Sequence, residues 1–311
     1  MQALSICVPG CLIQYDRSMR QLNRCWCAVA FVTSLFITQT GFAQKTQYTV
    51  EDKVLVTGDM VDLKITYYKS TGQKNAPVVI LLHGKAGNRQ NWKKIAEVLQ
   101  EKAGFAVVTV DLRGHGDSHI KSKKPDYQAM AINDLEAVKE FLLEEHQKGQ
   151  LNVNKLGIVG CEFSAAVAMY YTEFDWSKEP FDDSPNPNER TPRGQDVQAL
   201  VLISPDTSVA GLSPSRTASA LREIDKLAVM IATSEKSGRD LATAKKLYDQ
   251  ITSKRVKSEQ FLLNKYPEDV TGMNLVWQDE QLKEDIAQFL IKYVHDSSSD
   301  WHDRRSRLDR D

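Results

Sequence analysis

Residues 157–166 read Gly157-Ile158-Val159-Gly160-Cys161-Glu162-Phe163-Ser164-Ala165-Ala166. The mostly apolar run 155–159 predicts a buried strand. A helical pattern begins near Glu162, so the chain passes from strand to helix through a very short turn. Such a strand–turn–helix unit is typical of folds in which helices cover a parallel sheet.

The same alternation of short apolar runs and helical patterns continues in both directions. We predict further strands at residues 53–57, 63–69, 78–82, 105–110, 199–203, 227–232 and 260–263, and helices at 92–101, 127–145 and 274–294. The first two strands alternate in polarity and form a predicted hairpin. The others are mostly apolar, which indicates buried strands, and parallel strands need crossover connections between them. The sequence therefore predicts an α/β fold, a mostly parallel sheet flanked by helices on both faces, with an N-terminal β-hairpin.

Two polar segments interrupt this pattern. Residues 173–196 contain four prolines and no apolar period, which predicts either a lid over the sheet edge or a solvated loop. Residues 296–311 are charged and contain Ser, which predicts a disordered tail. We therefore expect one large domain over residues 44–295.

The N-terminal segment has the pattern of an export signal. Arg20 and Arg24 precede an uncharged, mostly apolar run at 25–37, and Gly41 and Ala43 supply small residues before Gln44. This pattern predicts a signal peptide over residues 1–43, cleaved between Ala43 and Gln44, with Met19 as an alternative start. The apolar run is too short to cross about 30 Å of hydrocarbon. We expect a secreted or periplasmic protein without a stable membrane anchor.

Composition narrows the expected partners and cofactors. The formal net charge of -1 provides no positive field, so a nucleic-acid partner is not expected. The His, Cys and Asp residues show no metal-ligand spacing, and we expect neither a metal nor another cofactor. Among the 5 cysteines, only Cys161 lies outside the predicted signal peptide, so the exported chain would hold no internal disulfide.

Three stretches in this order resemble the α/β-hydrolase family. The first is Val78-Val79-Ile80-Leu81-Leu82-His83-Gly84, a buried strand that ends in His-Gly. The second is Asp111-Leu112-Arg113-Gly114-His115-Gly116-Asp117-Ser118, and the third is the strand–turn–helix unit quoted above. The resemblance covers roughly residues 52–294 and implies the fold of the family, whereas function has to be argued from the site.

The resemblance places the family's nucleophile elbow, G-x-S-x-G, at the turn before the helix. Small residues stand two positions before and after the nucleophile because the turn is too tight for larger side chains. Gly160 and Ser164 fill these positions, so Glu162 stands where the family has its nucleophilic Ser. With Cys161 as nucleophile instead, Val159 and Phe163 would occupy the crowded positions, which steric constraints disfavour.

The other two members of the family's catalytic triad are also replaced at the positions that the resemblance implies. The acid is expected after the strand at 227–232, where Ser237 stands, although Asp240 and Glu235 nearby leave a displaced acid open. The histidine is expected before the last helix, where Thr271 stands. The 6 histidines include none between the elbow and the end of that helix, which His295 closes.

Three interpretations of Glu162 remain open. It could form an ester intermediate, as the Asp of dehalogenase-like relatives does, but that chemistry needs a His to activate water. It could contact a cationic or hydroxyl-bearing ligand. Alternatively its role is structural, since a helix N-terminus stabilises a carboxylate. The carboxylate could then fold into the vacated oxyanion hole, whose donors the resemblance places at the backbone N–H groups of Phe163 and of Lys85 or Ala86.

Together these residues predict a pseudo-hydrolase, because triad members act as a unit and the loss of one removes most of the catalytic effect. Its partner would be an unknown small molecule or protein. The alternative is an active ester- or peptide-directed hydrolase with a non-standard site that uses Glu162.

Overall fold

The computed structural model describes residues 48–71, 73–121, 124–253 and 259–310, all within one unit of the chain, Thr46–Asp311. The predicted signal peptide, its cleavage site between Ala43 and Gln44 and the alternative start at Met19 lie outside the described residues. Among the helices described, none combines the length and the apolar character needed to cross a membrane.

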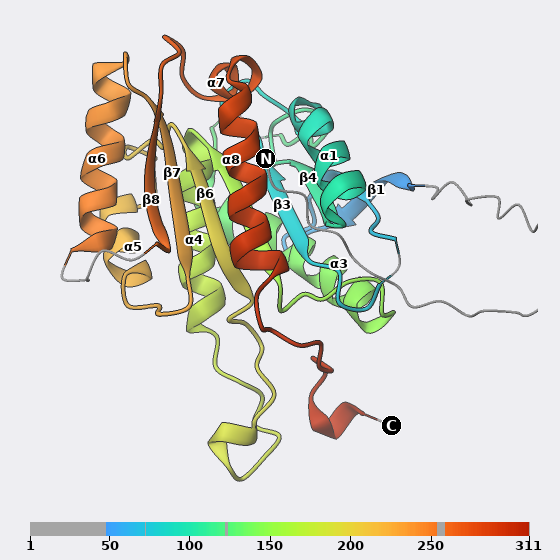
Figure 1. Cartoon of the computed structure of the whole chain (residues 1–311). Coiled ribbons are helices and arrows are strands. Elements are labelled where there is room, and N and C mark those ends of the chain that lie inside the picture. Colours follow the sequence, from blue (N-terminus) through green and yellow to red (C-terminus); the bar gives the residue numbers. More distant parts are fainter. Residues whose placement is uncertain (1–47, 72, 122–123, 254–258, 311) are drawn as a thin grey trace, which may run out of the picture. The chain divides into compact units, whose positions relative to one another are not determined.

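An eight-stranded sheet forms the centre of this unit (Figure 1). The strands are β1 (Val50–Val56), β2 (Asp62–Tyr68), β3 (Val78–Leu82), β4 (Ala106–Asp111), β5 (Leu156–Cys161), β6 (Val197–Ile203), β7 (Ala228–Ser234) and β8 (Phe261–Tyr266). Their order is β1-β2-β4-β3-β5-β6-β7-β8. The β1–β2 hairpin is antiparallel and joins β4 antiparallel, whereas all neighbours from β4 to β8 are parallel. The predicted mostly parallel sheet with an N-terminal hairpin is confirmed.

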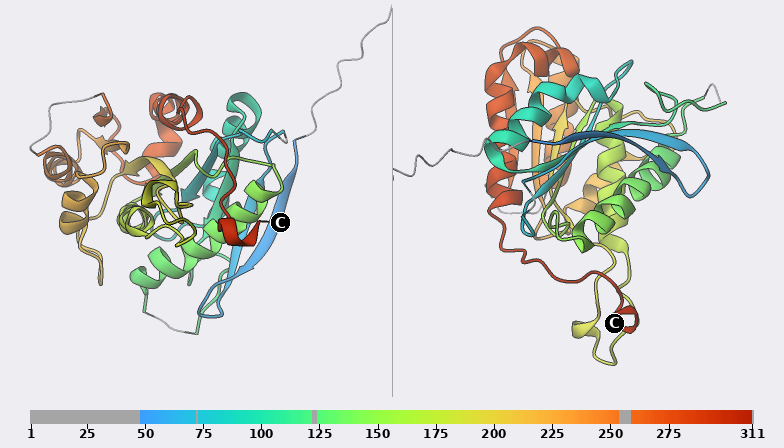
Figure 2. Two further views of the ribbon diagram at one scale, coloured as in Figure 1. Left: turned by 90° about the horizontal axis from the view of Figure 1, so that it is seen from below. Right: turned by 90° about the vertical axis from the view of Figure 1, so that its right-hand side faces the viewer.

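Successive residues of the buried strands point into two separate hydrophobic cores, one on each face of the sheet. In β3, Ile80 packs into one core and Leu81 into the other. The first core lies under α3 (Leu135–Gln147), α4 (Phe163–Ser177), α5 (Pro214–Leu221) and α6 (Gly238–Thr252). The second lies under α1 (Lys93–Ala103), α7 (Met273–Gln278) and α8 (Glu280–Leu290), as Figure 2 shows from the side. Burial of both strand faces explains why strands such as β3 are apolar throughout.

Two of the predicted helices are interrupted. The last helix divides at Asp279, whose carboxylate accepts a hydrogen bond from the backbone N–H of Leu282 at 2.8 Å and caps α8. The helix predicted at 127–145 contains a π-helical segment, Met130–Asp134, between α2 (Tyr127–Ala129) and α3. The predicted helix at 92–101 is preceded by a 3-10 turn, Arg89–Trp92.

The polar segment 173–196 starts as part of α4, which continues to Ser177. The remaining residues project as a loop from the end of the sheet at which β6 begins (Figure 1). With 15 residues, α4 separates this loop from Glu162 by about 22 Å of helix. The loop therefore does not cover the turn at Glu162.

Residues 296–310 differ from the disordered tail that their composition predicts. Trp301 stacks on His146 with ring centroids 4.7 Å apart, and the buried Arg304 donates to the Asp196 carboxylate at 2.9 Å. Arg307 N–H donates to the Asp183 carboxylate at 2.8 Å, which joins the segment to the projecting loop. The prediction of disorder was wrong because these partners come from distant parts of the chain, which composition does not register.

Candidate functional site

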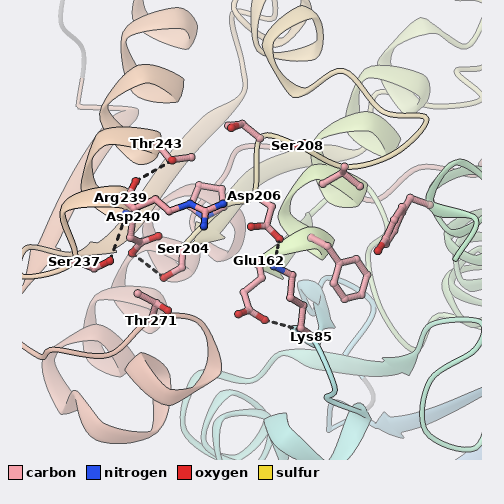
Figure 3. Close-up of a pocket in the computed structure, with 15 residues that line it drawn as sticks. Lys85, Glu162, Ser204, Asp206, Ser208, Ser237, Arg239, Asp240, Thr243 and Thr271 are labelled. Atoms are coloured by element: carbon pink, nitrogen blue, oxygen red, sulfur yellow. Dashed lines mark hydrogen bonds and ion pairs between the residues drawn. The ribbon is translucent and has the colours of Figure 1, made fainter.

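The candidate site lies at the carboxyl edge of the sheet, where the winding of the chain reverses. From β3 the chain moves to β4 on one side and then to β5 on the other. In open α/β sheets, ligands bind in the crevice at such a reversal. A pocket of about 420 Å³ occupies this place (Figure 3). It is lined by Lys85, Tyr127, Glu162, Phe163, Ser204, Pro205, Asp206, Thr207, Ser208, Val209, Ser237, Arg239, Asp240, Thr243 and Thr271.

This pocket contains all three positions at which the resemblance expects a triad. Glu162 follows β5, Ser237 follows β7 and Thr271 follows β8, and all three line the cavity together with Lys85. Ala86 is not among the lining residues, although its backbone has a positive φ of 53°. The sheet brings these loops together because parallel strands end at one edge.

The turn at Glu162 is tight and strained. Glu162 has φ 55° and ψ -118°, a region that residues other than Gly seldom adopt. A Cβ atom on Gly160 would lie 2.6 Å from the carbonyl oxygen of Ser164. The Ser164 hydroxyl accepts a hydrogen bond from the N–H of Cys161 at 2.8 Å. Both neighbours of the elbow are therefore small for geometric reasons.

The Glu162 carboxylate folds back toward the loop that follows β3. Its Oε2 accepts a hydrogen bond from the backbone N–H of Lys85 at 2.5 Å (Figure 3). The side chain passes between two glycines, and a Cβ on Gly272 would lie 2.7 Å from Oε1. A Cβ on Gly84 would collide with Oε2. The space beside the β3 loop therefore holds the side chain of the elbow residue itself.

Asp240 is held by the loops around it. Its Oδ2 accepts hydrogen bonds from Ser204 Oγ at 3.0 Å, Thr233 Oγ1 at 2.8 Å and the backbone N–H of Ser234 at 3.1 Å. Ser204 Oγ in turn accepts from the N–H of Gly272 at 2.9 Å. Asp240 and Ser204 therefore tie the loop after β7 to the loop that carries Thr271. A buried or half-buried carboxylate with three donors serves well as a structural anchor.

Ser237 and Glu235 lie differently from Asp240. The Ser237 hydroxyl accepts a hydrogen bond from the backbone N–H of Asp240 at 3.4 Å and caps α6. Glu235 is exposed and is not among the residues that line the pocket. Ser237, which stands at the expected acid position, therefore acts as the N-cap of α6.

Two histidines lie beside the elbow but outside the pocket lining. His83 is fully buried; its Nδ1 lies 2.9 Å from the carbonyl oxygen of Gly84 and its Nε2 accepts from the N–H of Leu112 at 3.3 Å. Burial lowers the pKa of His83 to about 4. His115 stacks on Phe163 with centroids 5.3 Å apart. None of the described residues that line the pocket is a histidine.

The remaining histidines lie elsewhere in the fold. His295 is exposed and pairs with Asp296 at 2.7 Å, and its ring contacts Phe105, which precedes β4. His146 and His302 contact one another near the C-terminal segment, where the His302 carbonyl oxygen lies 2.9 Å from His146 Nε2. His119 is exposed.

Charged groups at the pocket are largely paired. Lys85 Nζ forms an ion pair with Asp206 at 2.9 Å, and this hydrogen bond raises the pKa of Lys85. Arg239 extends its guanidinium toward the cavity in Figure 3. Cys161 is buried in the sheet, and burial raises the pKa of its thiol well above the usual value. A neutral, buried thiol is a poor nucleophile, as the steric argument against Cys161 also indicates.

The loop after β4 is braced by ion pairs rather than directed into the pocket. Arg113 donates to Asp134 at 2.7 Å and to Asp59 at 2.6 Å. The carboxylate of Asp111 accepts from the backbone N–H groups of Arg89 at 2.6 Å and Asp117 at 2.8 Å. Burial raises the pKa of Asp134 to about 6, against the opposing effect of Arg113.

Sequence reasoning missed the contribution of the loop after β6. Ser204, Pro205, Asp206, Thr207 and Ser208 follow that strand directly and line the pocket. Polar residues directly after a buried parallel strand lie at the edge where ligands bind, and this signal would have pointed to them. Arg239 was also missed, because one arginine on an exposed helix carries no signal of its own.

The comparisons with known proteins agree with this architecture. Residues 77–174 match the model of the alpha/beta hydrolase fold family. The chain is 34% identical over 80 residues to an sn-1-specific diacylglycerol lipase of Mus musculus, covering 26% of this chain and 25% of the relative. It is 27% identical over 109 residues to a proline iminopeptidase of Lactobacillus helveticus, covering 34% of each chain. The chain thus spans roughly a quarter to a third of these two relatives.

Solved structures cover much more of the chain at low identity. A dienelactone hydrolase from Anabaena variabilis superposes with a TM-score of 0.57 at 17% identity, covering 80% of this chain and 99% of that structure. A Pyrococcus furiosus esterase superposes with a TM-score of 0.55 at 15% identity, covering 79% and 94%. Sheet order, elbow geometry and these likenesses agree: the chain has the α/β-hydrolase fold.

Proposed function

We propose that this protein is an exported α/β-hydrolase-fold protein that binds a small hydroxyl-bearing molecule in the pocket of Figure 3 without hydrolysing it. The observation that carries the proposal is the bond from Lys85 N–H to the Glu162 carboxylate. Where a hydrolase of this fold needs a free nucleophile and an empty oxyanion site, this chain has a carboxylate that engages a backbone donor. Support for export comes from the pattern of residues 20–43 alone.

The chemistry of serine acyl transfer also lacks its base here. A Ser nucleophile needs a positioned histidine to take its proton and an acid to orient that histidine. Thr271 stands at the expected histidine position, and the buried His83 beside the elbow has its Nε2 occupied by the N–H of Leu112. Thr271 and the occupied His83 therefore support ligand binding in the pocket better than ester hydrolysis.

The lining favours a ligand rich in hydroxyl groups. Hydroxyl side chains enter the pocket from three loops and from α6 (Ser204, Thr207, Ser208, Ser237, Thr243 and Thr271). Tyr127 and Phe163 add aromatic surface on one side, with ring centroids 5.3 Å apart. A volume of about 420 Å³ falls within the usual range of small-molecule sites. A monosaccharide-sized polyol fits this combination of size and polarity.

The second candidate function is hydrolysis through Glu162 itself. It is favoured by the backbone of Glu162, whose φ of 55° presents the side chain at the elbow as a nucleophile would be presented. An ester formed on Glu162 would still need a base to activate water. Asp240 already accepts three hydrogen bonds, so it is poorly placed for that task.

The two functions are separated by hydrolysis of p-nitrophenyl acetate and p-nitrophenyl butyrate. We would assay the full-length chain and its secreted form beside Glu162→Ala and Glu162→Ser, with Glu280→Ala as an exposed control. We expect background rates for all five proteins, because no histidine is positioned as a base among the described residues that line the pocket. A wild-type rate above background that Glu162→Ala abolishes would establish Glu162 as the nucleophile and overturn the binding proposal.

Binding is tested in the same preparations. Thermal unfolding is measured with a panel of monosaccharides and sugar alcohols, and a stabilising compound is then titrated by calorimetry. We expect the bound compound to lose affinity in Ser208→Ala/Thr271→Val, which removes two lining hydroxyls and leaves the Ser204 bridge between Asp240 and Gly272 intact. If no compound of the panel shifts the melting temperature, a polyol is not the ligand.

A further inference from the structure

A second groove lies on the other helical layer, between α1 and α7. Its volume is about 420 Å³, and residues of the Arg89–Trp92 turn, α1, α7 and α8 line it. Its apolar floor is formed by Ile95 and Val276, both buried. It shares no lining residue with the pocket at Glu162.

One wall of the groove is an exposed aromatic ring. Trp277 is 50% exposed, whereas Trp92 is fully buried among the described residues. The indole N–H of Trp277 donates to the carbonyl oxygen of Asn91 at 3.4 Å. Because this bond uses the only donor of the ring, the faces of the indole are what remains for a ligand.

Three lysines line the groove together with this ring. Lys93, Lys94 and Lys283 line the groove from α1 and α8. Lys283 pairs with Glu280 at 2.5 Å and also donates to the Trp277 carbonyl oxygen at 3.2 Å. Lys93 lies 3.9 Å from Glu97, a long contact between two exposed side chains.

Lys94 has no acidic group within ion-pair distance in the described part of the chain. The lysines that line the groove therefore outnumber the acidic side chains paired with them. This excess of positive charge is complementary to an anion.

The position of two of these lysines is unfavourable for the helix itself. Lys93 and Lys94 occupy the first turn of α1, which contains no acidic residue. The positive end of the helix dipole repels both ammonium groups. Departures from local preference of this kind are expected at functional sites.

We propose that this groove binds a ring that carries a carboxylate, with the ring stacked on Trp277 and the carboxylate beside Lys93 and Lys94. The apolar floor and the indole face accommodate the ring, and the lysines provide charge complementarity. The same chemistry occurs in aromatic carboxylates and in uronic acids. The proposal is independent of the function of the pocket at Glu162.

The test uses the full-length chain labelled with 5-fluorotryptophan, in which Trp277→Phe assigns the ¹⁹F resonance of the indole. The probes are 2-naphthoate and glucuronate, each beside its neutral counterpart, 2-naphthamide and glucose. We expect a carboxylate probe to shift the Trp277 resonance with saturation at one site, and its neutral counterpart to bind at least tenfold more weakly. Saturation by glucuronate identifies an acidic sugar, and saturation by 2-naphthoate alone identifies an aromatic acid.

Two double variants distinguish the groove from general charge effects. Lys93→Gln/Lys94→Gln is expected to weaken binding about five- to tenfold, as two exposed charge contacts are lost. The matched control Lys102→Gln/Lys148→Gln removes two exposed lysines outside the groove and is expected to leave affinity unchanged. The proposal is overturned if neither carboxylate shifts the Trp277 resonance, or if both double variants bind alike.

Discussion

Glu162 shows how a strained residue is accommodated at the elbow. A residue other than Gly at φ 55° costs roughly 1–3 kcal/mol. The carboxylate recovers part of this cost by accepting a hydrogen bond from the N–H of Lys85, since such charge-assisted bonds contribute roughly 1.5–3 kcal/mol. The bond requires glycine on both sides of the carboxylate, at Gly84 and Gly272.

A prediction at this scale concerns Gly160. In Gly160→Ala the new methyl group would lie 2.6 Å from the Ser164 carbonyl oxygen and 2.7 Å from the Ala165 Cα, both backbone atoms. We expect the free energy of unfolding to fall by about 1–3 kcal/mol, the usual cost of overpacking. Gly58→Ala is the control, because no atom lies within 4 Å of its added Cβ. Equal stability of the two variants in urea unfolding would contradict the packing argument.

At the scale of elements, the C-terminal segment 296–310 is held by partners that are distant in sequence. Its Arg304 enters a buried cluster in which Lys139 Nζ lies 2.6 Å from Asp196 and 2.9 Å from Asp175. The cluster therefore contains two cationic and two anionic side chains. Its groups come from α3, α4, the start of β6 and the C-terminal segment, so the segment closes a network that the rest of the fold leaves incomplete.

Removal of Arg304 is expected to be costly. In Arg304→Ala, the carboxylate of Asp196 keeps Lys139 but loses its other buried partner. We expect destabilisation of about 3–5 kcal/mol, as for other buried ion pairs from which one partner is removed. Arg307→Ala serves as the control, because its ion pair with Glu189 is exposed and 3.7 Å long. Chemical unfolding measures both, and a change below 1 kcal/mol in Arg304→Ala would show that the segment does not stabilise the fold.

For the whole molecule, two buried histidines link stability to pH. His83 and His146 are each held neutral, since one ring nitrogen accepts a backbone N–H, from Leu112 and Val153 respectively. Burial lowers the pKa of both to about 4. They lie at different ends of the unit, His83 at the carboxyl edge of β3 and His146 in the last turn of α3. Protonation of these histidines at low pH would therefore destabilise both ends of the domain.

The sign of the pH dependence follows from the lowered pKa values. The unfolded histidines bind protons below about pH 6.5, whereas the folded ones stay neutral until about pH 4. Their contribution to stability is complete above pH 6.5 and is lost as the pH falls toward 4. Asp134, whose pKa is raised to about 6, opposes this loss over the same interval.

We expect the free energy of unfolding to decrease between pH 6.5 and 4.5, with a smaller slope in His146→Gln. Urea unfolding at several pH values measures it. The exposed His119 provides a control, and His119→Gln should keep the wild-type slope. A wild-type slope of zero or of opposite sign would show that the carboxyl groups dominate.

Local sequence determined the alternation of strands and helices and the elbow itself. Apolar periodicity locates each strand, and the spacing of Gly160, Glu162 and Ser164 encodes a tight turn whose sterics depend on near neighbours only. The three motifs also sufficed to predict the fold, because each is a short contiguous stretch. The break in the last helix at Asp279 was not predicted, because a single capping side chain ends one helix and starts the next without changing the apolar periodicity.

Tertiary structure alone decided how the site is filled and how the C-terminus is held. Lys85 and Glu162 are 77 positions apart, and Ser204 joins Asp240 to Gly272 across three loops. Arg304 meets Asp196 across 108 positions, which reversed the prediction of disorder. Such contacts depend on which strand ends and surfaces the sheet brings together. The local sequence around a charged residue is the same whether its side chain is solvated or paired with a buried carboxylate. Only the folded chain distinguishes these two environments.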